Sequence, residues 1–106
     1  FLAKLIDYFY QHMNFDGFIQ SVSTGKLPGL NSIYLETLWY AGTGNWNKAH
    51  ELIQDEPGKD AALLHAYLHR VEGDQWNAEY WYRKAGEKCP SSGLQEEWQS
   101  LVKRYL

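Results

Sequence analysis

Apolar side chains recur along most of the chain at the three- and four-residue spacing of amphipathic helices. The pattern runs through residues 1–13 and resumes over a shorter segment that begins near Asn14. Such spacing places the apolar side chains on one stripe of a helix. Residues 1–24 are therefore predicted to form two helices, the second ending at the Gly- and Pro-bearing connector STGKLPGLNS. The apolar stripe of the first helix consists of Leu2, Leu5, Ile6, Phe9 and Met13.

Residues 31–87 continue the helical spacing, but two of their helices carry two apolar faces. One begins at about Asn31 or Ser32, and the other covers about residues 60–72. A helix needs two such faces when it is packed between neighbours. Each is followed by a Gly-bearing turn and a further helix, so this region is predicted to form two helical hairpins. The second of these further helices cannot continue past Pro90.

A last helical pattern covers residues 92–106. Ser92 followed by Gln95 matches a capping box and predicts the start of this helix. No segment shows the alternation typical of a strand. The sequence thus predicts an all-α fold of about six to seven helices in a single domain, with N-terminal helices in 1–24, two hairpins in 31–87 and a C-terminal capping helix in 92–106.

The two hairpins share a spacing of 29 residues. The paired positions are Gly44 and Gly73, Ala49 and Ala78, Leu52 and Trp81, and Ile53 and Tyr82. The second unit resembles the second half of a tetratricopeptide repeat, which has Gly in the turn, then Ala, an aromatic residue, Ala and Pro. The residues that carry this resemblance are Gly73, Ala78, Tyr82, Ala85 and Pro90, with Tyr40, Gly44 and Ala49 one unit earlier.

The resemblance implies a right-handed array of stacked antiparallel hairpins that binds a protein or peptide. The chain departs from the family in its repeat length, which is about 34 residues in tetratricopeptide proteins. It also has Ala62, His65 and Ala66 where the family has Trp, Leu and Gly. The segment LHRVEGDQWNAEYWYRKAG is similar to uncharacterised bacterial and fungal proteins, which brings no function with it.

Charge and composition exclude several classes of function. Ten Lys and Arg against thirteen Asp and Glu give a net charge of −3, and the basic residues are scattered, so we expect no nucleic-acid partner. The apolar runs are too short for a membrane helix. Cys89, the single cysteine, forms no internal disulfide and favours a cytoplasmic location. No motif for a nucleophile or an organic cofactor occurs, and we assign no catalytic residue.

The leading hypothesis is a protein-binding or scaffold module. Trp76, Tyr80, Arg83 and Lys84 fall on the outer face of their helix, and exposed aromatic rings beside cations are typical of interface anchors. Two hairpins are also close to the minimum that stacking stabilises, so self-association is a further prediction.

The alternative hypothesis is a metal or small-molecule site around two histidines. His65, His69 and Glu72 recur at i, i+4 and i+7, which places three potential metal ligands on one helix face. Ala66 excludes the H-E-x-x-H motif of metalloproteases. His12 and His50 are further potential ligands, although the sequence does not place them. Arg70, Asn77 and Tyr82 extend the polar set, in which His65 or His69 would serve as the base of a hydrolytic reaction.

A purely structural role for the histidines is the third possibility. Hairpin packing would turn His65 and His69 toward Ala78, Tyr82 and Ala85, where a half-buried ring donates to a Tyr hydroxyl, a carbonyl or Glu72. Trp81 and Tyr82 are predicted to point to the core, and Asp74 to cap the next helix. A pocket open to solvent beside both imidazoles would favour a site, whereas closure by Ala78 and Tyr82 would favour a core.

Overall fold

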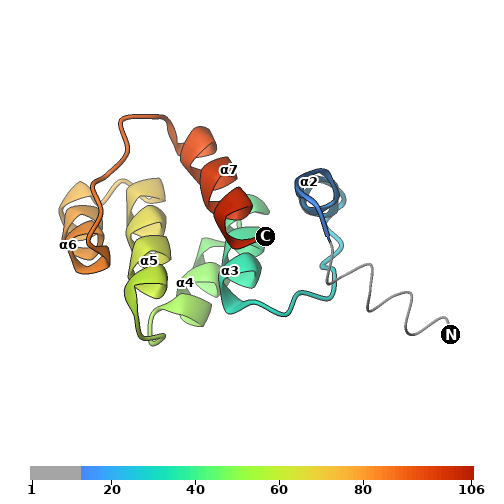
Figure 1. Ribbon diagram of the computed structural model, residues 1–106, viewed down its shortest axis with the longest axis horizontal. Coiled ribbons are helices and arrows are strands. Elements are labelled where there is room, and N and C mark those ends of the chain that lie inside the picture. Colours follow the sequence, from blue (N-terminus) through green and yellow to red (C-terminus); the bar gives the residue numbers. More distant parts are fainter. Residues whose placement is uncertain (1–12) are drawn as a thin grey trace, which may run out of the picture.

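Six α-helices and no strands make up residues 13–106, the part of the chain that the computed structural model describes (Figure 1). The fold class is therefore all-α, as predicted. The first predicted helix falls almost entirely on residues 1–12, outside the described part. No helix within residues 13–106 is long and apolar enough to cross a membrane. The helices are α2 (Phe15–Thr24), α3 (Ile33–Gly42), α4 (Trp46–Ile53), α5 (Lys59–Val71), α6 (Gln75–Ala85) and α7 (Leu94–Tyr105).

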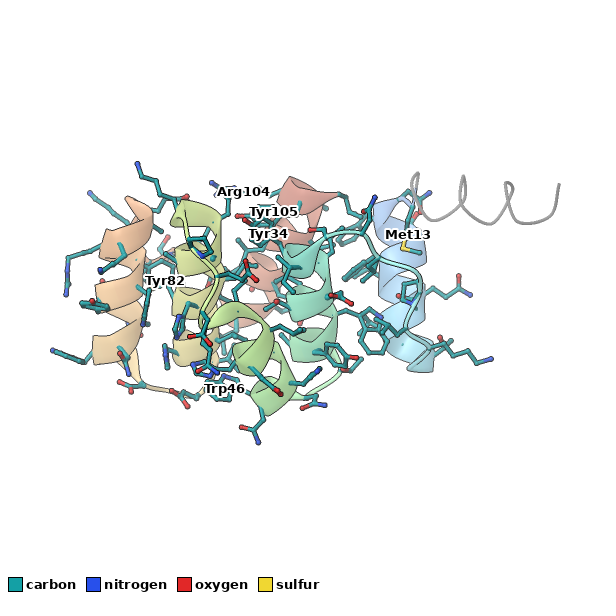
Figure 2. All side chains as sticks on the ribbon, turned by 90° about the horizontal axis from the view of Figure 1, so that it is seen from below. Met13, Tyr34, Trp46, Tyr82, Arg104 and Tyr105 are labelled. Atoms are coloured by element: carbon teal, nitrogen blue, oxygen red, sulfur yellow. The ribbon has the colours of Figure 1, made fainter. Side chains whose placement is uncertain are left out.

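Two antiparallel hairpins, α3 with α4 and α5 with α6, stack side by side along the molecule (Figure 1). Helix α4 contacts α5, and α7 packs against both α3 and α5. Figure 2 shows the rings of Tyr34 and Tyr105 together where α3 meets α7, with their centroids 5.1 Å apart. The α2 helix lies beyond α3, at the opposite end of the stack from α6.

The turns inside the two hairpins are built in the same way. Gly44 and Gly73 have φ angles of 84° and 85°, a left-handed conformation that favours glycine. The residue after each glycine, Asn45 or Asp74, donates its N–H to a carbonyl five residues earlier. The same residue then caps the next helix through its side-chain oxygen. The capping role predicted for Asp74 is confirmed, and the 29-residue spacing corresponds to equivalent backbone positions.

The core runs along α5, which has neighbours on several sides. Residues 61–69 are all buried, as expected for a helix with two apolar faces. Ala49 and Ala78 occupy equivalent fully buried positions in α4 and α6, and so do Ile53 and Tyr82. The small side chains of Ala49 and Ala78 allow α4 and α6 to pack closely against their neighbours.

Helix α7 is fixed on the stack by its tryptophan. Trp98 is 4% exposed and its indole N–H donates to the Leu38 carbonyl over 2.8 Å. The start of α7 differs from the prediction: the N-cap residue is Gly93, which makes no side-chain capping bond. Ser92 does not cap the helix, and its carbonyl accepts a hydrogen bond from Arg70.

Candidate functional site

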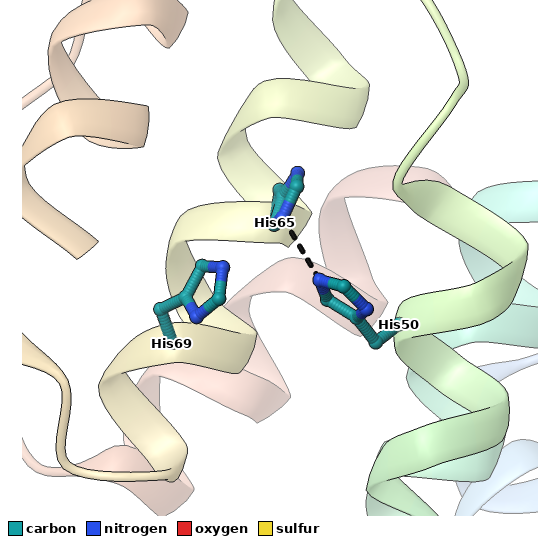
Figure 3. A group of neighbouring side chains, drawn as sticks. All are labelled: His50, His65 and His69. Atoms are coloured by element: carbon teal, nitrogen blue, oxygen red, sulfur yellow. Dashed lines mark hydrogen bonds between the residues drawn. The ribbon is translucent and has the colours of Figure 1, made fainter. Parts of the chain in front are cut away.

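Three histidines meet between α4 and α5 (Figure 3). His65 and His69 lie one turn apart on α5, and His50 faces them from α4. The Nε2 atoms of His50 and His65 are 3.1 Å apart. Each of the three rings offers one nitrogen, and these nitrogens all lie within 4.8 Å of one another. We call these three residues the histidine cluster.

Two tryptophans enclose the histidine cluster. The Trp46 ring stacks on His50 with centroids 4.7 Å apart, and the Trp81 ring stacks on His65 at 3.9 Å. Trp46 is itself fixed, because its indole N–H donates to the Leu68 carbonyl over 2.6 Å. The side chains of His65 and His69 belong to the buried set, with only 6% and 8% of each residue exposed. The cluster is therefore largely shielded from solvent.

This environment favours the neutral form of His65 and His50. Burial lowers the pKa of His65 to about 4, and repulsion from His50 and His69 contributes in the same direction. Burial also lowers the pKa of His50, together with repulsion from His69 and against the attraction of nearby acids, chiefly Glu72. In the short contact between these two rings, one neutral imidazole must donate its N–H to the other. Neutral rings are the form that binds metals.

Acidification is expected to destabilise the metal-free protein through His65. The unfolded chain takes up a proton below about pH 6.5, whereas folded His65 does so only near 4. Stability is therefore lost as the pH falls below 6.5, by about 2 kcal/mol between pH 7.5 and 5.0 from this group alone. Urea unfolding with a chelator present would measure it. The His65→Gln variant should show a flatter pH dependence, and parallel curves would contradict this assignment.

A carboxylate fixes the orientation of His69. Glu72 Oε1 lies 2.6 Å from Nδ1 of His69, so this contact does not occupy Nε2 of that ring. Of the predicted ligand set, His65 and His69 belong to the histidine cluster. Its third member is His50 and not the predicted Glu72, which instead binds Nδ1 of His69. Glu72 also forms a second, more exposed group of potential ligands with His69 and Asp74.

Arg70 and Tyr82 do not join the histidines. Both bind Glu97 of α7: Arg70 Nη1 donates to Oε1 over 2.8 Å, and the Tyr82 hydroxyl donates to Oε2 over 2.6 Å. Burial and the Glu97 carboxylate raise the pKa of Tyr82. Asn77 is also separate from the cluster, because its side-chain amide donates to the Asp74 carboxylate. The six-residue polar site expected from the sequence is thus divided: Arg70 and Tyr82 bind Glu97, whereas Asn77 reaches only Asp74, at the edge of the group formed with His69 and Glu72.

The predicted interface residues do share one exposed face of α6. Trp76 is 77% exposed and Tyr80 38% exposed, and Arg83 is also exposed. The ammonium of Lys84 lies 5.4 Å from the centroid of the Tyr80 ring, a cation–π distance. The helix spacing predicted this grouping correctly, and whether a partner binds there stays a prediction.

A pocket of about 360 Å³ opens beside one side of the cluster. His65 lines it and His69 does not, so the expected opening beside both rings is found for only one of them. Trp81 forms part of the wall, since it is half-buried rather than a core residue. The lining consists of Glu56, Pro57, Gly58, Lys59, Ala61, Ala62, His65, Trp81 and Lys84.

The sequence prediction for the surroundings of the histidine rings was right only in part. Both rings contact His50 of α4, which the prediction did not foresee, and neither pairs with Tyr82, whose hydroxyl donates to Glu97. The predicted side toward α6 holds in part, because His65 also stacks on Trp81, and the predicted pairing with Glu72 is confirmed for His69. The sequence did not place His50 and did not connect Trp46 with the histidines. The spacing of Trp46 and His50, four residues apart on one helix, is the signal that links them to each other, but no spacing links them to α5.

No protein-family model, no curated protein sequence and no solved structure matches this chain.

Proposed function

We propose that the protein is a small helical domain that binds a divalent transition metal, preferentially Zn²⁺, through His50, His65 and His69. The observation that carries the proposal is the convergence of three imidazole nitrogens within 4.8 Å from two different helices. Imidazole is a preferred ligand of zinc and of its neighbours among the transition metals.

The cluster geometry is close to that of a metal centre. Zn–N bonds of 2.0–2.1 Å in a tetrahedral site place two ligand nitrogens about 3.3 Å apart. The Nε2 atoms of His50 and His65 are 3.1 Å apart, close to this separation, and both rings would rotate so that these nitrogens point to the ion instead of to each other. The third imidazole, His69, would have to turn out of its stacked position beside His65. Three protein ligands would leave one position for water or a ligand, the arrangement that hydrolytic zinc sites use.

Glu72 supports the same proposal. In metal-binding histidines the N–H of the second ring nitrogen commonly donates to a carboxylate, which fixes the ring and its tautomer. The 2.6 Å contact between Glu72 and Nδ1 of His69 has this geometry. It would present Nε2 of His69 to the metal.

The proposal is tested by thermal unfolding of tag-free protein after chelation, with Zn²⁺ or Co²⁺ then added. A metal that binds only the folded state adds about 2.7 kcal/mol at a free concentration 100 times its Kd. We expect a higher Tm in the wild type and a loss of that increase in His50→Gln, His65→Gln and His69→Gln. Co²⁺ should also develop the visible absorption of a tetrahedral nitrogen site.

Cys89→Ser is the matched control, because it removes the only thiol while leaving the imidazoles intact. It should keep the full metal response. If metals leave the wild-type Tm unchanged while the three histidine variants only lower it, the cluster is structural and the proposal fails.

A second candidate function is protein or peptide binding by the outer face of α6. Its support is the 77% exposure of Trp76, a side chain that is enriched among interface anchors. The equivalent turns of the two hairpins support a tetratricopeptide-like repeat, which would suit such a role. A cytoplasmic location remains a proposal based on the single cysteine.

A further inference from the structure

The pocket beside His65 has the size of a small-molecule site. Its volume of about 360 Å³ lies at the lower end of the range for such sites, roughly 300–1,000 Å³. It is formed where the start of α5 faces α6. A ligand of this size would be a compact organic molecule.

Two lysines from different helices give the pocket a positive charge. Lys59 begins α5 and Lys84 lies in the last turn of α6. Neither ammonium forms an ion pair with any residue from 13 to 106. Glu56 is the one acidic residue in the lining, so the side chains carry one net positive charge if His65 is neutral.

The backbone at the start of α5 adds to this potential. Its N-cap residue is Gly58, with no side-chain oxygen to accept from the first N–H groups. The corresponding ends of α4 and α6 are capped by Asn45 and Asp74. Unpaired N–H groups at the positive end of a helix favour an anion.

The remaining lining shows what else the ligand should carry. Ala61, Ala62 and Trp81 supply apolar wall. His65 is only 6% exposed, and among the described residues its single hydrogen-bond partner is His50, through Nε2. Its ring therefore offers a second nitrogen that no side chain in residues 13–106 engages, and the same residue lines the pocket.

We propose that this pocket binds a small organic anion, a phosphate monoester or carboxylate with an apolar body, whose charged group pairs with Lys59 and Lys84. The apolar body would lie against Trp81 and the alanines of α5. This goes beyond the metal proposal and does not need a metal, because the lysines, the helix end and the apolar wall belong to the protein itself.

Isothermal titration calorimetry in low-salt buffer with a chelator tests the proposal. The probes are phenyl phosphate and phenylacetate, with benzyl alcohol as the neutral comparison. We expect at least one of the two anions to bind the wild type and benzyl alcohol to bind much more weakly. Which anion binds more tightly identifies the charged group.

Four variants make the test specific. Lys59→Gln and Lys84→Gln should each weaken binding about threefold to fivefold, as expected for losing one partly exposed charge pair. Glu56→Gln should strengthen it by a similar factor, since it removes the opposing charge. Lys103→Gln is the control, because its ammonium lies over the Phe15 ring, away from the pocket lining, and should leave the affinity unchanged.

Opposite effects of the lysine and glutamate variants on the affinity would support a pocket that binds anions through their charge. Absence of binding by both anions, or equal affinities in Lys59→Gln, Lys84→Gln and Lys103→Gln, would overturn the proposal. Since every titration contains a chelator, failure of the metal proposal would not change these results.

Discussion

Glu97→Ala is expected to lower the free energy of unfolding by about 3–5 kcal/mol. Glu97 is 3% exposed and accepts hydrogen bonds from Arg70 and Tyr82, over 2.8 and 2.6 Å. Removing the carboxylate leaves Nη1 of Arg70 and the buried Tyr82 hydroxyl without an acceptor, while Nη2 of Arg70 keeps its bond to the Ser92 carbonyl. The loss is large because the partners must then either remain unpaired or expose themselves to water.

Urea unfolding followed by tryptophan fluorescence would measure this effect. Glu97→Gln keeps the side-chain volume and one acceptor oxygen, so we expect a smaller loss than for alanine. Glu51→Ala, an exposed position in α4, is the control and should change stability by no more than about 0.5 kcal/mol. If Glu97→Ala were as mild as that control, α7 would not be held to α5 and α6 by this network.

The helices and their turns were predictable because their signals are local. Helical spacing, the left-handed glycines and the cap at Asp74 depend on residues within a few positions of one another. The predicted start of α7 was wrong because the contact that matters there is not local. Ser92, the predicted cap, has its carbonyl bound by Arg70, a residue 22 positions earlier in the chain.

The candidate site could be predicted only in part, because its contacts join distant segments. The spacing of His65 and His69 is a property of α5 alone, so their common helix face could be predicted. The approach of His50, 15 residues earlier, depends on how α4 rotates against α5. The same holds for Glu97, which draws Arg70 and Tyr82 away from the histidines although Arg70 directly follows His69. Sequence spacing gives the face of a helix but not which neighbour covers it.

Gly42→Ala is expected to lower the free energy of unfolding by about 2–3 kcal/mol, the cost of overpacking a well-filled contact. Alanine normally stabilises a helix relative to glycine, by up to about 1 kcal/mol in the interior. At Gly42, however, an added Cβ would lie 2.5 Å from Cζ2 of Trp98 and 3.2 Å from Cγ1 of Val22. Trp98 is buried and its N–H is bound to Leu38, so the ring has no room to withdraw.

The comparison with Gly17→Ala isolates this cause. Gly17 also lies in a helix, but the nearest atom to its added Cβ is Oδ1 of the N-cap residue Asn14 at 3.2 Å, which accepts a hydrogen bond from the Gly17 N–H and needs to move by only a few tenths of an ångström. That variant should therefore cost clearly less than Gly42→Ala. In addition, Gly42→Ala should cost less in a Trp98→Leu background than in the wild type, since the two residues are in direct contact. A gain in stability from Gly42→Ala alone would contradict the contact between Trp98 and the end of α3. Alanine could express its helix preference there only if no side chain covered this position.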